Sequence, residues 1–148
     1  MRIEQSVSVN APRDVVWAVL VDVETWPQLT DSVTSLNRLE TGPLRVGSRA
    51  SIKQPRLPTS VWTVTELVDH ERFTWDTSGP GWRTHAVHDV IPAGPGSCTL
   101  HLLLEITGPV GEVMGRLTAG TARRYVGMEA EGIKRHAESQ ARGPAAGP

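Results

Sequence analysis

Hydrophobic and polar residues alternate over most of the first hundred positions, and the pattern then changes to a helical spacing. In residues 2–10, Ile3, Val7 and Val9 share one face and polar residues share the other, which predicts a half-buried strand. Pro12 then opens a helix, because hydrophobic residues follow it at helical spacing: Val15, Val16, Val19 and Leu20.

Residues 22–29 predict a second short helix or a turn, broken at Trp26-Pro27 because the residue before a proline disfavours the helical conformation. From Val33 onward the chain predicts about six strands separated by turn signals. These signals are Gly42-Pro43, Pro55 to Pro58, Asp69-His70, Gly79 to Gly81 and Ala93 to Gly96.

The long segment 108–137 predicts the main helix, because Gly108-Pro109 marks its start and apolar residues recur three or four positions apart. Its apolar stripe comprises Val110, Val113, Met114, Leu117, Tyr125, Met128 and Ile133. Five glycines in this helix each cost about 1 kcal/mol relative to alanine, so tertiary packing must hold it. Residues 1–138 are therefore expected to form one domain, and the small, polar, proline-containing segment 139–148 a disordered tail.

Alternation in the strands predicts which side chains face the helix, since a one-residue slip would turn every side chain over. Pairing Val90 with Cys98 across the last hairpin places its alternate residues on the inner face and sets Arg83 opposite Glu105 outside. The strand residues assigned to the inner face are Trp62, Val64, Glu66, Val68, Phe73, Trp75, Thr77, Trp82, Thr84, Ala86, His88, Val90, Cys98, Leu100, Leu102, Leu104 and Ile106.

Three polar residues interrupt these apolar faces: Glu66 and His88 on the sheet, and Arg124 on the helix. One interpretation is structural, with Glu66 and Arg124 forming an ion pair or reaching to solvent. The other is a cavity in which His88 acts as a donor, an acceptor or a general base and Arg124 binds an anion or an enolate. The sequence leaves both interpretations open.

Composition narrows the class of protein. The 148 residues carry a net charge of −1 and no basic stripe, which argues against nucleic acid as a partner. No apolar run is long enough for a membrane span, and the N-terminus predicts a strand instead of a signal segment. The lone Cys98 excludes an internal disulfide and fits a cytoplasmic location.

No metal or cofactor site is predicted. His85 and His88 are three positions apart, which places them on opposite faces of a strand, and His101 has no zinc-type ligands beside it. Phosphate-binding and dinucleotide-binding glycine motifs are absent from the sequence.

Several segments together resemble a known superfamily. They are VNAPRDVVWAVLVDVETWPQLTDSVTSL, VGSRASIKQPRLPTSVWTVTEL, ERFTW, HDVIPAGPGSCTL and the closing helix. Over residues 2–138 the chain resembles the START-like helix-grip (SRPBCC) superfamily, nearest to its polyketide cyclase/dehydrase and lipid-transfer branch. The resemblance implies an α+β fold with a β-αα-β6-α order, in which a curved antiparallel sheet of about seven strands grips the C-terminal helix around an internal cavity.

The same resemblance implies several functions, because the group includes aromatic polyketide cyclases, lipid and sterol carriers and hormone receptors. The segment KQPRLPTSVWTVTEL is similar to a sub-branch of small bacterial proteins. Aromatase/cyclases of the group often use an arginine and tyrosines, for which Arg124 and Tyr125 would stand in here.

We therefore expect a cytoplasmic monomer or homodimer that binds a small apolar or aromatic molecule between sheet and helix. One alternative is a polyketide cyclase/dehydratase with His88 and Arg124 as catalytic residues, and another is a protein-interaction module without a ligand. The expected ligand-binding residues are Trp62, Val64, Glu66, Phe73, Trp75, Trp82, Thr84, Ala86, Leu100, Leu102, Leu117, Thr121, Tyr125 and Met128.

Overall fold

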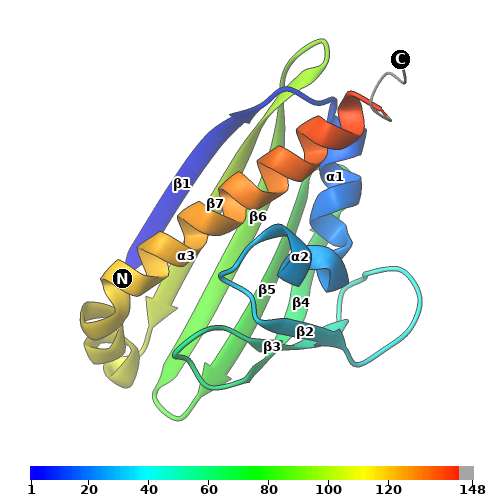
Figure 1. Cartoon of the computed structure of the whole chain (residues 1–148). Coiled ribbons are helices and arrows are strands. Elements are labelled where there is room, and N and C mark those ends of the chain that lie inside the picture. Colours follow the sequence, from blue (N-terminus) through cyan, green and yellow to red (C-terminus); the bar gives the residue numbers. More distant parts are fainter. Residues whose placement is uncertain (144–148) are drawn as a thin grey trace.

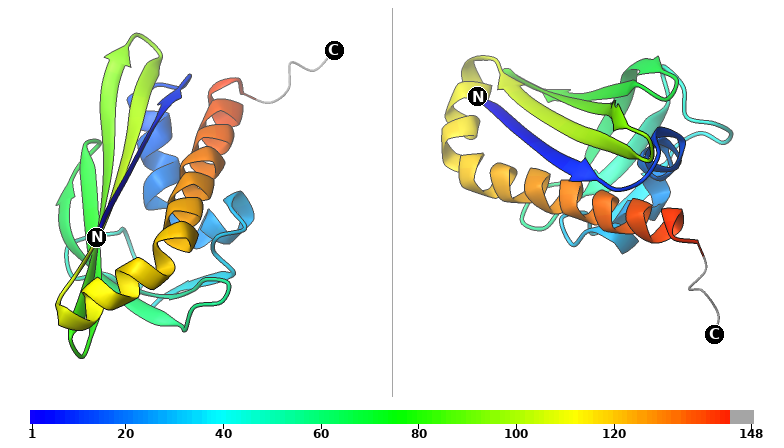
Figure 2. Two further views of the ribbon diagram at one scale, coloured as in Figure 1. Left: turned by 90° about the vertical axis from the view of Figure 1, so that its left-hand side faces the viewer. Right: turned by 90° about the horizontal axis from the view of Figure 1, so that it is seen from above.

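Within residues 1–143, which the computed structural model describes, seven antiparallel strands form one curved sheet (Figure 1). The sheet order is β1-β7-β6-β5-β4-β3-β2. Its strands are β1 (Arg2–Val9), β2 (Ser35–Arg38), β3 (Arg49–Lys53), β4 (Ser60–Val68), β5 (Arg72–Gly79), β6 (Trp82–Gly94) and β7 (Ser97–Thr107). Two further views show the helices on one face of the sheet (Figure 2). The arrangement confirms the α+β helix-grip fold that the sequence predicts.

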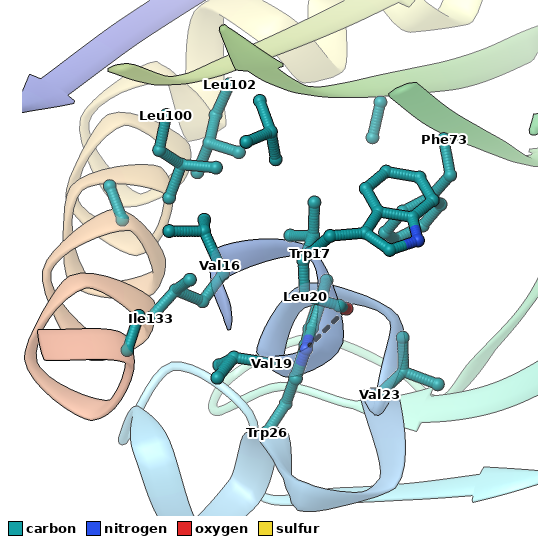
Figure 3. Close-up of a cluster of buried hydrophobic side chains, with 14 of the residues drawn as sticks. Val16, Trp17, Val19, Leu20, Val23, Trp26, Phe73, Leu100, Leu102 and Ile133 are labelled. Carbon is teal, nitrogen blue, oxygen red and sulfur yellow. Dashed lines mark hydrogen bonds between the residues drawn. The ribbon is translucent and has the colours of Figure 1, made fainter. Parts of the chain in front are cut away.

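The segment between β1 and β2 forms α1 (Arg13–Val21), a 3₁₀ turn (Val23–Thr25) and α2 (Trp26–Leu29). The predicted break at Trp26-Pro27 does not occur, because Trp26 is helical (φ −54°, ψ −38°) and begins α2. Pro27 lies in the first turn of α2, where its missing N–H costs nothing. The indole of Trp26 donates a hydrogen bond to the Leu20 carbonyl at 3.2 Å, which ties α2 back to α1. Figure 3 shows this bond inside the apolar cluster that α1 forms with β5, β7 and the C-terminal helix.

The β6–β7 hairpin has the predicted faces but not the predicted pairing. Val90 lies opposite Leu100 instead of Cys98, because the strands continue beyond Pro92 and only Pro95-Gly96 forms the turn. A shift of two residues preserves each side chain's face. Arg83 consequently lies opposite Thr107 and not Glu105, and it donates a hydrogen bond to Asp76 at 2.7 Å instead.

A bulge in β4 overturns part of the predicted inner face. The register shifts between Val64 and Glu66, so Leu67 pairs with Phe73 on the inner face. Glu66 pairs with Thr74 on the outer face, where its carboxylate lies 3.8 Å from the Arg72 guanidinium. Val68 is likewise exposed on the outer face. The extra residue of a bulge moves every later side chain of that strand to the opposite face from the one that strict alternation assigns.

Charged side chains cross the outer face of the sheet in an alternating row. Arg72 donates to Asp89 at 2.5 and 3.0 Å, and His101 contacts both Asp89 at 3.3 Å and Glu4 at 2.9 Å. Burial raises the pKa of Asp89, but the hydrogen bonds from Arg72 and His101 outweigh it, so this pKa lies below its ordinary value. Cross-strand pairs of opposite charge therefore stabilise the face that no helix covers.

The main helix, α3 (Pro109–Ala141), buries a stripe made mostly of small residues. Val110, Val113 and Leu117, which the sequence assigns to the buried stripe, are 45%, 57% and 80% exposed. Tyr125 and Ile133 are buried as the stripe predicts, and the other buried residues are Gly111, Gly115, Val126, Ala130, Gly132 and Ala137. The helix also continues past residue 138, so residues 139–141 belong to it, and the predicted tail from 144 to 148 lies outside the described residues.

Gly132 fixes how closely α3 approaches α2. A Cβ atom there would lie 2.3 Å from the Leu29 carbonyl oxygen, whereas a Cβ at the exposed Gly120 would meet nothing within 4 Å. Gly132→Ala is expected to destabilise the protein by about 1–3 kcal/mol through overpacking. Gly120→Ala should stabilise it by up to about 1 kcal/mol through helix propensity. Urea unfolding of the two variants measures both effects, and a Gly132→Ala variant as stable as the wild type would contradict the close contact.

Candidate functional site

A cavity of about 200 Å³ lies between the sheet and the N-terminal two thirds of α3. It is lined by Trp26, Val33, Ile52, Gln54, Leu57, Pro58, Ser60, Trp62, Trp75, Thr77, Trp82, Thr84, Ala86, His88, Leu104, Ile106, Met114, Thr118, Thr121, Ala122, Tyr125, Val126 and Glu129. Small side chains on the helix leave this space open, because Thr118, Thr121 and Ala122 face the sheet where larger residues would fill the gap.

The structure brings together part of the predicted site. The predicted residues that line the cavity are Trp62, Trp75, Trp82, Thr84, Ala86, His88, Thr121 and Tyr125. A second group, Val64, Phe73, Leu100 and Leu102, is buried in the apolar core beside the cavity (Figure 3 labels the last three). The role of each residue in binding stays a prediction.

The remaining predicted residues lie elsewhere. Glu66 is on the outer face, and Arg124 and Leu117 are exposed on α3, so the anticipated Glu66–Arg124 pair does not form and neither residue faces the cavity. Met128 is half-buried but is not among the residues around the cavity. The first half of the helix is rotated relative to the prediction, because Gly111 and Gly115 are buried there while Val113 and Leu117 are exposed.

Four of the five tryptophans line the cavity and make its walls aromatic. Trp75 is central, since its ring lies 5.4 Å from that of Trp26 and 5.8 Å from that of Trp62, in edge-on and tilted arrangements. Such contacts each contribute about 0.5–1.5 kcal/mol beyond the area they bury. Trp26 is not among the predicted site residues, because the sequence places it only in a short helix. The excess of tryptophan over other aromatic residues is the one feature of the sequence that could have indicated its place in the cavity wall.

His88 is the main polar group of the cavity, and its ring is held on three sides. The Phe73 ring stacks on it at 4.2 Å with an interplanar angle of 11°. The Nδ1 atom lies 3.2 Å from the Phe73 carbonyl oxygen, and Nε2 lies 3.1 Å from Oε1 of Glu129 on α3. The two side chains are only 4% and 15% exposed.

The hydrogen-bond partners determine where the protons of this pair lie. A carbonyl oxygen only accepts, so Nδ1 of His88 carries a hydrogen. Nε2 of His88 and Oε1 of Glu129 lie within hydrogen-bond distance, so a proton can pass between them. Glu129 is not among the predicted site residues, although it lies one helical turn after Tyr125, which is predicted to face the sheet.

Tyr125 connects the helix to the loop between β3 and β4. Its hydroxyl donates to the Pro55 carbonyl at 2.6 Å. The same loop is held by Lys53, which donates to the Gln54 carbonyl at 2.7 Å, and by the Gln54 amide, which donates to the Ser32 carbonyl at 3.1 Å. These bonds place Gln54, Leu57 and Pro58 over one end of the cavity, where the lining residues are partly exposed.

The structure places the histidines on opposite faces, as the strand spacing predicts. His85 contacts Asp76 outside, whereas His88 faces the cavity. In the part of the chain that the structure describes, no three histidine, cysteine or acidic side chains are grouped so that they could hold a metal ion. Among residues 1–143, no helix is long and apolar enough to cross a membrane.

An antiparallel sheet gripping a helix over an aromatic cavity defines a START-like protein. The chain belongs to the family described as polyketide cyclase / dehydrase and lipid transport, whose model matches residues 1–138. This confirms the resemblance seen in the sequence. No curated protein sequence matches the chain.

Solved structures share the fold at low sequence identity. The Zhui aromatase/cyclase from Streptomyces sp. R1128 is 18% identical, with a TM-score of 0.78 over 99% of this chain and 98% of that one. A START superfamily protein from Mycobacterium smegmatis is also 18% identical, with a TM-score of 0.67 over 91% and 97% of the two chains. Norcoclaurine synthase from Thalictrum flavum is 16% identical, with a TM-score of 0.67 over 92% and 85%.

The placement of Arg124 and Glu66 on different surfaces leads to a direct test. Arg124→Met and Glu66→Gln should each change the free energy of unfolding by less than about 0.5 kcal/mol, because both side chains are exposed. The double variant should equal the sum of the two. As a control, Glu66→Gln with Arg72→Met should show a weak coupling of about 0.2–1 kcal/mol, since those two side chains form an exposed ion pair. A larger coupling between Arg124 and Glu66 would contradict the bulged register of β4.

Proposed function

We propose that the protein binds a small apolar or aromatic molecule in the cavity between the sheet and α3. The observation that carries the proposal is a cavity with tryptophan walls and one buried polar pair, His88 and Glu129. Ligand sites are typically apolar and aromatic, with a few polar groups that fix the orientation of the ligand. A protein-interaction module would have no need for this space, so the cavity favours a ligand.

The aromatic and the polar residues of the cavity have different roles in the proposed binding. Trp26, Trp62 and Trp75 form the aromatic surface against which a flat molecule packs, and Trp82 lies at the start of β6 near the N-terminus of α3. His88 and Glu129 orient the polar end of the molecule. The norcoclaurine synthase structure, which shares the fold, holds dopamine and hydroxybenzaldehyde, and it supports the proposal to that extent.

Binding is tested with a panel of small aromatic and aliphatic probes, by tryptophan fluorescence and by thermal melting. Aromatic probes should change the emission of the cavity tryptophans and raise the Tm, because a ligand that binds only the folded state stabilises it. At a free concentration of one hundred times Kd, the stabilisation is about 2.7 kcal/mol. Trp75→Leu should lower the affinity for aromatic probes, and Trp17→Leu, which alters the one tryptophan outside the cavity lining, should leave affinity unchanged. A panel that changes neither signal would contradict the proposal.

A second candidate function is catalysis, and the His88–Glu129 pair favours it. Its two side chains lie 3.1 Å apart, within reach for proton transfer, and both line the cavity. It can therefore take a proton from the carbon next to a ligand carbonyl and deliver a proton to a hydroxyl leaving from the next carbon. Water is then released, a carbon–carbon double bond forms, and the pair regains its original proton count. This chemistry is dehydration of the kind that accompanies polyketide cyclisation. Arg124 has no part in it, because it lies outside the cavity.

The catalytic candidate is tested with aryl β-hydroxyketones, whose dehydration gives a conjugated product with a stronger ultraviolet absorbance. The wild-type protein should accelerate dehydration, and His88→Gln and Glu129→Gln should each reduce the rate by about 100-fold or more. Probe affinity should change much less than the rate in both variants. A wild-type rate equal to that in buffer would eliminate dehydration of these probes and leave the binding function standing.

A further inference from the structure

The size, the charge and the hydrogen-bonding groups of the cavity together restrict what it can bind. We propose that the cavity selects an uncharged hydroxyaromatic molecule of one or two rings, whose hydroxyl group binds the free carboxyl oxygen of Glu129. This inference rests on the proposed binding function and specifies the ligand class of the same site.

Size sets the number of rings. An enclosed apolar cavity of about 150 Å³ holds a single benzene ring, whereas sites for drug-sized ligands begin at about 300 Å³. The cavity here measures about 200 Å³, which lies between the two. One ring or two fused rings fit this volume, and a third or fourth ring would have to extend past the partly exposed end of the cavity. The surrounding walls consist largely of β-sheet and helix side chains, which are close-packed and resist expansion.

Charge sets the second limit. None of the described residues that line the cavity is a lysine or an arginine, and its ionisable side chains are His88, Tyr125 and Glu129. Tyr125 is engaged with the Pro55 carbonyl, and His88 is engaged with Glu129. An anionic ligand would thus be desolvated beside a carboxyl group with no cation to neutralise it. A cationic ligand would compete with His88 for Glu129 and disrupt the pair.

The hydrogen-bonding pattern favours a hydroxyl. In the hydrogen bonds of residues 1–143, Glu129 uses Oε1 to contact His88, and Oε2 has no partner. This oxygen belongs to a side chain that lines the cavity, so it can accept a hydrogen bond from a ligand hydroxyl. Glu129 is partly exposed, so water can reach this oxygen in the free protein. A ligand that fills the cavity without offering a donor would remove that water and leave the oxygen unpaired, which penalises its binding.

The test is calorimetric titration of the full chain at neutral pH with a matched series of naphthalene derivatives. Naphthol should bind about tenfold more tightly than methoxynaphthalene, which has the same rings but no donor. Naphthoate and aminomethylnaphthalene, the anionic and cationic members, should bind at least about tenfold more weakly than naphthol. Hydroxyanthracene, with a third ring, should bind more weakly than naphthol.

Two variants assign the hydroxyl to Glu129. Glu129→Gln keeps the size of the side chain but weakens the acceptor, so the preference for naphthol over methoxynaphthalene should fall to about threefold or less. Thr118→Val is the control, because the Thr118 hydroxyl already donates to the Met114 carbonyl at 2.7 Å, and it should keep the preference. Circular dichroism melts of both variants establish that they are folded.

The outcomes separate the inference from the proposed function. If no member of the series binds, both fail. If hydroxyanthracene or naphthoate binds as tightly as naphthol, the ligand class proposed here is wrong, while binding of an aromatic molecule stands. A hydroxyl preference that is lost in Thr118→Val and kept in Glu129→Gln would overturn the assignment to Glu129.

Discussion

The close approach of α3 to the sheet near its start and to α2 near its end is the constraint on which the cavity depends. Near its start, Gly111 lies against Ile106 and Trp82, and Gly115 lies against Met1. Near its end, Ala130, Gly132 and Ala137 are buried, and Gly132 touches the backbone at Leu29. Between these two contacts α3 passes over the curved sheet, and its side chains there are too small to fill the space beneath them. The glycines are costly for the helix alone and are required by this packing.

Stability alone does not explain the His88–Glu129 pair. Placing two ionisable groups in an apolar enclosure costs desolvation that their mutual attraction does not fully recover, and apolar replacements are often equally stable. Here the Phe73 carbonyl fixes the proton on Nδ1 and the Phe73 ring fixes the imidazole plane. The pair is therefore oriented before any ligand arrives. Preorganised polar groups in an otherwise apolar site are the feature that ligand recognition and proton transfer share.

The sequence predicted the fold because alternation, turn residues and one long helical segment all point to the same architecture. It predicted most faces of the sheet for the same reason, since faces depend only on the period of two. The errors lie where the length of a turn or an extra residue in a strand changes which residues pair. The β6–β7 hairpin turns at Pro95-Gly96, so Val90 pairs with Leu100 and not with Cys98. The bulge in β4 places Glu66 on the outer face. Local sequence carries no clear signal for a bulge, because its cause is the packing of neighbouring strands.

The candidate site was harder to predict than the fold because the orientation of α3 depends on small residues. Hydrophobic periodicity assigns the largest apolar side chains to the buried face, and by that rule Leu117 and Arg124 faced the sheet. In the structure the first half of α3 buries Gly111 and Gly115 instead, so the helix is rotated there, and Glu129 lies against His88. The rotation of α3 about its axis thus determines which polar side chains face the cavity. This rotation cannot be inferred from a shared fold at 18% sequence identity. Proteins with this fold can place different polar residues opposite the same sheet strand, so the function of each must be argued from the side chains around its own cavity.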